Sequence, residues 1–181
     1  MSIVIFGGEQ YYTPKKEKLK ALIKPVHEKF LGDGALYLWN PSVQESDRLI
    51  QNLVNALYNL QAWFPKLLKK AQRELPVIEL PRTIRFGLSR GTIYQLTRVD
   101  GTKEYIGICI NLASRLQRYC PELNFLASAR INVSEAYLNK RKYRRVVAKA
   151  IPGFPREVVI VDEDAFKKLH TETRESLFDE L

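Results

Sequence analysis

Residues 105–116 read Tyr-Ile-Gly-Ile-Cys-Ile-Asn-Leu-Ala-Ser-Arg-Leu, an apolar run with two strongly polar side chains inside it. The apolar spacing, ended by Pro121, predicts a helix over residues 108–119. Asn111 and Arg115 are four positions apart, so they share one face of that helix. A side-chain amide beside a guanidinium suits a sugar hydroxyl and a phosphate. The alternative is a helix-capping asparagine followed by a surface arginine.

Two hairpins are predicted on the N-terminal side of this helix. The first covers residues 26–39 and turns at Gly32-Asp33-Gly34. The second covers residues 83–97 and turns at Arg90-Gly91. Tight hairpins join antiparallel strands, whereas parallel strands need long crossover connections. We therefore expect a sheet that is largely antiparallel.

The remaining segments complete an alternating pattern of strands and helices. Further strands are predicted at residues 2–6, 124–128, 143–150 and 157–161. Helices are predicted at residues 13–24, at 134–138, at 164–169, and from 40–42 to 74 with a break or kink at Pro65. This order predicts an α+β fold with helices packed on a mixed, mostly antiparallel sheet.

Composition limits the class of protein. The 181 residues, 45% of them hydrophobic, suffice for one domain over residues 1–181 and exclude a disordered or fibrous chain. No apolar run approaches the roughly 20 residues of a membrane helix, and no signal peptide is visible, so we expect a cytoplasmic protein. Two cysteines, Cys109 and Cys120, predict free thiols. The net charge of +9 favours polyanionic partners or a solvated basic surface.

Three other segments carry polar chemistry. Asp33, between two glycines, could hold a hard cation such as Mg²⁺, or it could simply belong to an Asp-Gly turn. Lys149 stands near the end of a strand, where a lysine is usually just solvated. Residues 137–145 combine five basic side chains with tyrosines. That run could bind a nucleic-acid backbone, although an exposed connection is the simpler interpretation and makes a nucleic-acid partner unlikely.

Four segments together resemble the class III nucleotidyl cyclase catalytic domain, the adenylate and guanylate cyclase family. Its hairpin reads K-x-x-G-D-G/A, its later helix reads G-x-x-V-N-x-A-[AS]-R-[LM], and a hairpin and a late V-K-G segment accompany them. Residues 29–38, 85–96, 107–116 and 147–153 are similar to these patterns in the same order. The resemblance implies a ferredoxin-like βαββαβ core. It also implies conversion of a nucleoside triphosphate into a 3′,5′-cyclic nucleotide and pyrophosphate, for second-messenger signalling.

The resemblance also implies catalytic and metal-binding roles. Asn111 would orient the ribose, and Arg115 would stabilise charge on the α-phosphate. Lys149 would contact the terminal phosphates. Asp33 would bind two divalent cations, Mg²⁺ or Mn²⁺, which activate the hydroxyl and neutralise the triphosphate.

Base recognition and assembly are implied in the same way. Lys29 and Glu104 stand where the family reads the base, and Glu104 replaces the aspartate usual in purine-selective adenylate cyclases. The site would lie between two protomers, so a homodimer is expected. Asp33 of one chain would face four residues of its partner: Asn111, Arg115, Lys29 and Glu104. Small bacterial cyclases of antiviral signalling that act on UTP or CTP belong to this family too, so the base stays open between pyrimidine and purine.

The first strand departs from the family pattern. It ends Ile-Phe-Gly-Gly-Glu over residues 5–9, where the family has its first metal-binding aspartate. Catalysis could be lost, Glu9 could substitute, or a loop could be missing from the sequence between Phe6 and Gly7. Two other functions therefore remain open. One is a degenerate cyclase-like module that binds a nucleotide or a partner, and the other is a basic RNA-binding domain.

Overall fold

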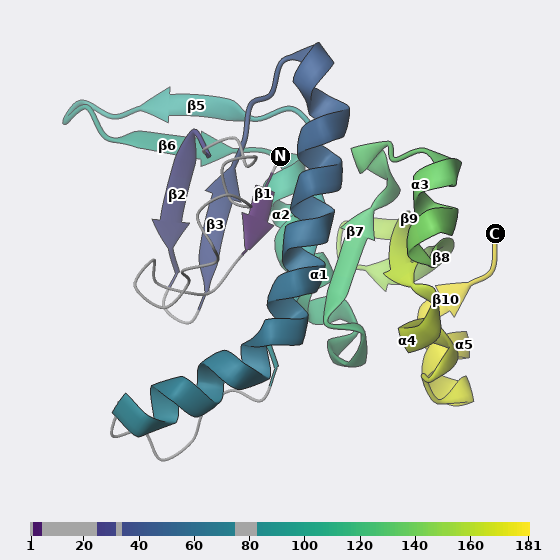
Figure 1. Ribbon diagram of the computed structural model, residues 1–181. Coiled ribbons are helices and arrows are strands. Elements are labelled where there is room, and N and C mark those ends of the chain that lie inside the picture. The colour runs from purple at the N-terminus through teal and green to yellow at the C-terminus, as the bar shows by residue number, and fades with distance from the viewer. Residues whose placement is uncertain (1, 5–24, 32–33, 75–82) are drawn as a thin grey trace.

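An eight-stranded sheet forms the centre of the computed structural model, which describes residues 2–4, 25–31, 34–74 and 83–181 (Figure 1). The strands of this sheet are β1 (Ser2–Val4), β2 (His27–Phe30), β3 (Ala35–Leu38), β4 (Phe86–Ser89), β7 (Phe125–Ser128), β8 (Tyr143–Ile151), β9 (Phe154–Asp162) and β10 (Phe178–Asp179). Their order across the sheet is β10-β8-β9-β7-β4-β1-β3-β2. The pair β4–β7 is parallel, and the other described pairs in this sheet are antiparallel. The predicted α+β class with a mixed, mostly antiparallel sheet is confirmed.

Five α-helices surround the sheet in the described part of the chain. They are α1 (Val43–Glu74), α2 (Ile108–Tyr119), α3 (Glu135–Arg141), α4 (Glu163–Lys167) and α5 (Thr171–Leu177), with short 3₁₀ turns at η2 (Pro121–Leu123) and η3 (Ala129–Ile131). The bounds of α2 match the predicted helix. Helix α1 runs through Pro65 without a break, and Figure 1 shows it changing direction along its length, as a proline inside a helix favours.

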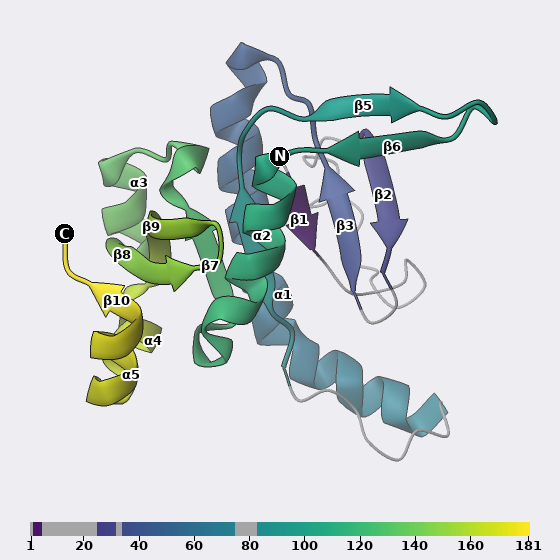
Figure 2. The same ribbon diagram turned by 180° about the vertical axis from the view of Figure 1, so that it is seen from behind.

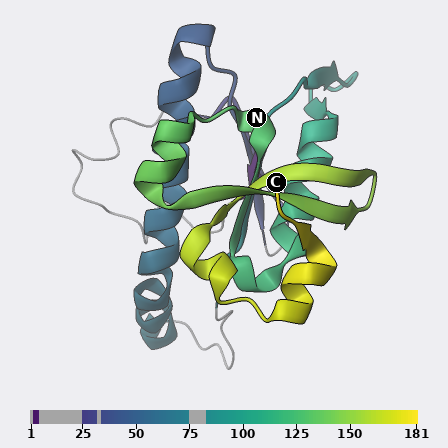
Figure 3. The same cartoon turned by 90° about the vertical axis from the view of Figure 1, so that its right-hand side faces the viewer.

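The sheet separates two hydrophobic cores (Figure 3). On one face, α1 and α3 cover a cluster that includes Leu53, Phe86 and Phe125. On the other face, α2 and α4 cover a cluster that includes Leu116 and Leu126. Adjacent residues of one strand serve opposite cores because side chains alternate along a strand. The sheet is therefore buried on both faces where α1 and α2 flank it.

The second predicted hairpin is wrong. Strand β4 pairs with β1 and β7, and not with β5 (Tyr94–Thr97). Strand β5 instead pairs with β6 (Lys103–Ile106), which was not predicted, in a separate two-stranded ribbon. Figure 2 shows this ribbon projecting away from the sheet beside β2 and β3. The segment that contains Arg90 and Gly91 instead carries the chain from β4 of the sheet to β5 of the ribbon.

The ends of the chain lie in the same sheet. The C-terminal segment forms α5 and then β10, which pairs with β8. Phe178 of β10 is buried against Tyr119 and Phe166.

The predicted helix at residues 13–24 lies outside the described residues. Both cysteines are buried and free, as predicted. Within the described ranges, no helix has the length and apolarity needed to cross a membrane.

Candidate functional site

Helix α2 sits unusually close to strand β4 because Gly87 has no side chain. A Cβ atom at Gly87 would lie 1.9 Å from the carbonyl oxygen of Ala113 and 2.8 Å from the amide nitrogen of Gln117. Leu112 and Leu116 are buried on the same side of α2. The helix therefore rests directly on the strand backbone, and its opposite face is turned outward (Figure 2).

Asn111 lies on the exposed part of α2 and does not cap it. The residue that caps the helix is Gly107, and no side chain accepts a capping hydrogen bond there. The alternative that Asn111 is a helix cap is therefore wrong. Its backbone amide points back to the Gly107 carbonyl oxygen at 3.5 Å, so the residue belongs to the helix itself. Its side-chain amide is exposed and can hydrogen-bond a ligand.

Arg115 is half-buried one turn further along the same helix face. Its Nη1 would lie 3.1 Å from a Cβ atom built on Gly153, so its guanidinium rests against the turn between β8 and β9. Contact with Arg115 leaves little room for a side chain at Gly153, and the φ of +75° at this residue also favours glycine. Among the described residues, no carboxylate forms an ion pair with Arg115. The arrangement positions a cation beside a turn and leaves its charge available to an anion.

Lys149 is engaged by the C-terminal segment. Its Nζ lies 2.8 Å from Asp179 Oδ1 and donates a hydrogen bond of 2.6 Å to the Glu175 carbonyl oxygen. Arg156, directly opposite Lys149 in the β8–β9 pair, lies 3.4 Å from the same carboxylate. The hydrogen bond from Lys149 holds the pKa of Asp179 below its ordinary value. In this arrangement the ammonium already has an anionic partner, which a phosphate would have to replace.

The hydroxyl of Tyr119, at the end of α2, fastens this segment further. It donates to the Lys149 carbonyl oxygen at 2.6 Å and also lies against the Leu177 carbonyl oxygen. Burial raises the pKa of Tyr119 to about 12, so the hydroxyl stays a donor at neutral pH. The end of α2, the predicted phosphate-binding lysine and the last strand are thus linked by hydrogen bonds.

Lys29 and Glu104 lie on neighbouring strands of two different sheets. Lys29 is exposed on β2, and Glu104 of β6 forms an ion pair of 2.7 Å with Arg98. The strands approach each other where the rings of His27 and Tyr105 lie 4.5 Å apart. The described residues contain no ion pair between Lys29 and Glu104.

A pocket of about 590 Å³ opens between the ribbon and the sheet. Trp39, Thr92 and Tyr105 are among its lining residues, and Cys109 of α2 lies next to it, with its Sγ atom 3.7 Å from the Thr92 carbonyl oxygen. None of the predicted site residues lines this pocket. Asn111 and Arg115 therefore do not belong to this pocket.

The predicted metal site falls outside the described residues. Asp33, Glu9 and the Phe6–Gly7 link all lie in the undescribed segments 5–24 and 32–33. Elsewhere in the described chain, no group of three or more histidine, cysteine or acidic side chains could hold a metal ion. The amide nitrogen of Leu31 donates to the Gly34 carbonyl oxygen at 2.7 Å, so the described flanks of residues 32–33 are closed as in a hairpin.

Sequence reasoning missed two residues that shape this region. Gly87 was noted only as part of a motif, although its lack of a side chain lets α2 approach the sheet. Asp179 was given no role in the sequence analysis, although it pairs with Lys149 thirty positions earlier. No local signal reveals such a pair, because it depends on β10 joining the edge of the sheet.

Comparison with known proteins adds a similarity of fold. No family model and no curated protein matches the sequence. The crystal structure of the adenylyl cyclase CyaB from P. aeruginosa is similar, with a TM-score of 0.57 and 18% identity over 88% of this chain and 92% of that one. The comparison with the guanylyl cyclase domain of the RhoGC fusion protein from the aquatic fungus Blastocladiella emersonii gives a TM-score of 0.47 and 12% identity. It covers 88% of this chain and 91% of that one. At 18% identity, the similarity to CyaB establishes a shared fold.

Proposed function

We propose that the protein is a nucleotidyl cyclase that makes a 3′,5′-cyclic nucleotide for signalling. The observation that carries the proposal is the pair of polar side chains on α2, with Asn111 exposed and Arg115 half-buried. Asn111 and Arg115 stand one turn apart on a helix fixed by Gly87 and by the Gly153 turn, at the positions where the resemblance requires them. A fold shared with an adenylyl cyclase supports the same assignment.

The proposed reaction is an in-line displacement at phosphorus. The ribose 3′-oxygen loses its proton and forms a bond to the α-phosphorus, while the bond to the bridging oxygen breaks and pyrophosphate leaves. Negative charge grows on the α-phosphate oxygens, and the Arg115 guanidinium, which has no described carboxylate partner, neutralises it. Asn111 fixes the ribose through its exposed amide. The chain thus contributes positioning and charge, with no covalent step of its own.

Lys149 is proposed to bind the terminal phosphates after an exchange of partners. The triphosphate would replace the Asp179 carboxylate on the Lys149 ammonium. Both side chains are partly exposed, so the existing ion pair is weak enough to exchange. Two divalent cations, Mg²⁺ or Mn²⁺, are proposed through Asp33, which lies outside the described residues. Bound there, these cations would supply activation of the ribose hydroxyl and neutralisation of the triphosphate charge.

A homodimer is proposed because large apolar side chains are exposed on three elements of the chain. Phe30 of edge strand β2 is 67% exposed, Tyr94 of β5 is 65% exposed, and Ile108 at the start of α2 is 67% exposed. Monomeric proteins seldom leave large apolar side chains clustered on a sheet edge. A second copy covering β2 and the ribbon would bring Asp33 of one chain to Asn111 and Arg115 of its partner.

Specificity for the base stays open between pyrimidines and purines. Lys29 and Glu104 are proposed to read it, with Glu104 released from Arg98. The role in bacterial antiviral signalling is a further part of the proposal and rests on the resemblance alone.

The two rival functions differ in their support. The degenerate module is favoured by one observation, the ion pair between Lys149 and Asp179. The RNA-binding alternative is weakened by the basic run itself. Tyr143 is buried, and Arg144 and Arg145 form ion pairs with Glu180 and Glu135. Those groups are therefore engaged within the chain.

Complementation between two inactive variants tests the proposal. Asp33→Ala and Arg115→Ala should each be inactive alone, because they remove opposite halves of each shared site. In an equal mixture, half of the dimers are mixed and each keeps one intact site, so about a quarter of the wild-type rate should return. A mixture that stays as inactive as its components would contradict a site shared between protomers.

A further inference from the structure

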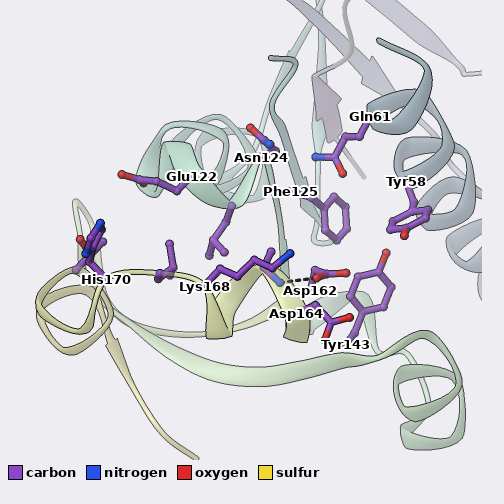
Figure 4. A pocket seen from close by; sticks show the side chains of 14 residues that line it. Tyr58, Gln61, Glu122, Asn124, Phe125, Tyr143, Asp162, Asp164, Lys168 and His170 are labelled. Atoms are coloured by element: carbon purple, nitrogen blue, oxygen red, sulfur yellow. Dashed lines mark hydrogen bonds between the residues drawn. The ribbon is translucent and has the colours of Figure 1, made fainter. Parts of the chain in front are cut away.

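A second pocket lies away from the α2 surface. It has a volume of about 510 Å³ and is bounded by the middle of α1, by η2 with the residues that lead into β7, and by α4 and the start of α5 (Figure 4). None of the residues assigned to the proposed cyclase site lines it. A role for this pocket therefore does not depend on the proposed function.

Two amide side chains that line this pocket each have one buried atom without a hydrogen-bond partner among the described residues. Gln61 of α1 and Asn124 before β7 both line it, and Figure 4 shows their side chains on the same side of the cavity. Gln61 Nε2 and Asn124 Oδ1 are buried atoms without a hydrogen-bond partner among the described residues. Burial of an unpaired polar atom is unfavourable, so buried polar atoms without partners are uncommon in folded proteins. One is a donor and the other an acceptor, and both would be satisfied by a single ligand edge.

The amide of Asn124 is not needed for the turn in which it stands. That residue has a φ of 47°, and the turn is closed by backbone hydrogen bonds, from the Phe86 amide to the Asn124 carbonyl oxygen and from the Asn124 amide to Pro121. Glycine would satisfy the same backbone conformation. The side-chain amide is thus free to serve a bound molecule.

The walls and charges of the pocket narrow the ligand class. The rings of Phe125 and Tyr143 line it with centroids 6.0 Å apart, which offers flat surfaces for a planar molecule. Three carboxylates, those of Glu122, Asp162 and Asp164, line the pocket with one lysine, Lys168. This excess of negative charge disfavours phosphates and other anions. The pocket is accordingly unsuited to a nucleoside triphosphate.

We propose that this pocket binds an uncharged planar heterocycle that carries a carbonyl oxygen and an N–H group, the chemistry of a free nucleobase or a lactam. The ligand carbonyl accepts a hydrogen bond from Gln61 Nε2. The ligand N–H donates to Asn124 Oδ1. The ring packs against the aromatic wall, and the site is separate from the cyclase site.

Nuclear magnetic resonance titration of the full chain tests this proposal with uracil as the probe. Uracil should shift the side-chain amide signals of Gln61 and Asn124. The matched probe 1,3-dimethyluracil keeps the ring and its carbonyls but has no N–H, so it should bind at least tenfold more weakly because Asn124 Oδ1 stays unpaired. Uridine monophosphate should bind this pocket more weakly than uracil because of its charge.

Three variants separate the site from the fold. Gln61→Leu and Asn124→Gly should each weaken uracil binding at least tenfold, the second without disturbing the left-handed turn. Gln44→Leu, an exposed glutamine on the same helix, should leave binding unchanged. The proposal is overturned if uracil shifts neither amide signal, if dimethyluracil binds as well as uracil, if the monophosphate binds this pocket more tightly, or if both pocket variants bind like the wild type.

Discussion

Substitution of Gly87 by alanine tests the contact that positions α2. The added Cβ would lie 1.9 Å from the Ala113 carbonyl oxygen, and heavy atoms essentially never approach a Cβ within 3.0 Å. The helix would therefore have to move by about 1 Å, in a region where side chains are packed as densely as in an organic crystal. The clashing atoms belong to the backbone of α2, so no rotation of a side chain relieves the overlap.

Overpacking of this kind costs about 3 kcal/mol, and for a chain of this length it lowers the melting temperature by roughly 10 °C. Urea unfolding followed by circular dichroism measures the change. The cyclase activity of the folded variant should fall by about a hundredfold, because a 1 Å displacement of Arg115 misplaces it against the reacting phosphate.

Gly101→Ala is the matched control. Gly101 has a φ of +81° and no atom within 4 Å of an added Cβ, so alanine there introduces backbone strain without overlap. We expect a loss of about 1 kcal/mol and unchanged specific activity. If Gly87→Ala and Gly101→Ala unfold at the same urea concentration, the close approach of α2 to β4 is refuted.

Three further predictions concern the site and its surroundings. Arg115→Ala should lower turnover about 10²- to 10³-fold in an assay of cyclic product, with no change in the free energy of unfolding. Arg118 is exposed on the same helix, and Arg118→Ala should leave turnover unchanged. Asp179→Asn should raise the affinity for inorganic tripolyphosphate roughly threefold by calorimetry, because it frees Lys149, and Lys149→Ala should remove the gain. Burial, followed by the hydrogen bond to Glu122, raises the pKa of Cys120 to about 11 from an ordinary 9.0, so this thiol should resist maleimide at pH 8 in the folded protein. Between these two pKa values, the Cys120 thiol keeps its proton in the folded protein and loses it in the unfolded protein. The contribution of this thiol to the free energy of unfolding is therefore complete below pH 9 and is lost as the pH rises through 11. Cys120→Ala should remove this pH dependence from the free energy of unfolding measured with urea.

Each of these predictions has an opposing result. Equal losses in Arg115→Ala and Arg118→Ala would remove Arg115 from the reaction. Unchanged tripolyphosphate affinity in Asp179→Asn would mean that the carboxylate does not compete for Lys149. Rapid labelling of Cys120 at pH 8, or an unfolding profile unaltered by Cys120→Ala between pH 9 and 11, would contradict its burial.

Local sequence signals predicted the elements whose ends are set locally. The bounds of α2 follow from its apolar spacing and from Pro121 beyond its end, and the β2–β3 hairpin follows from its glycine-rich turn. Both depend on residues close together in the chain, which is why periodicity and turn chemistry suffice.

Long-range pairing accounts for what the sequence did not reveal. Arg90-Gly91 resembles a hairpin turn, yet β4 pairs with β1 and β7. A Cβ atom built on Gly91 would lie 3.0 Å from the Cβ atom of Cys109 in α2. Strand β6 is mostly polar and pairs only with β5 in the described chain, so it has no apolar alternation to identify it. The pairing of Lys149 with Asp179 likewise arises only after β10 joins β8. Tertiary contacts determine which strands and side chains pair, and a local sequence pattern does not indicate which of the possible partners is chosen.

Incubation of the purified protein with ATP, GTP, CTP and UTP separately, in the presence of Mn²⁺, tests cyclase activity most directly. Mass spectrometry should detect a 3′,5′-cyclic nucleotide and pyrophosphate from at least one of the four, and at least about a hundredfold less of both from the Arg115→Ala variant. The identity of the product would also settle the preferred base. Absence of any cyclic product from all four triphosphates, with triphosphate binding still measurable, would contradict the enzyme and favour the degenerate nucleotide-binding module.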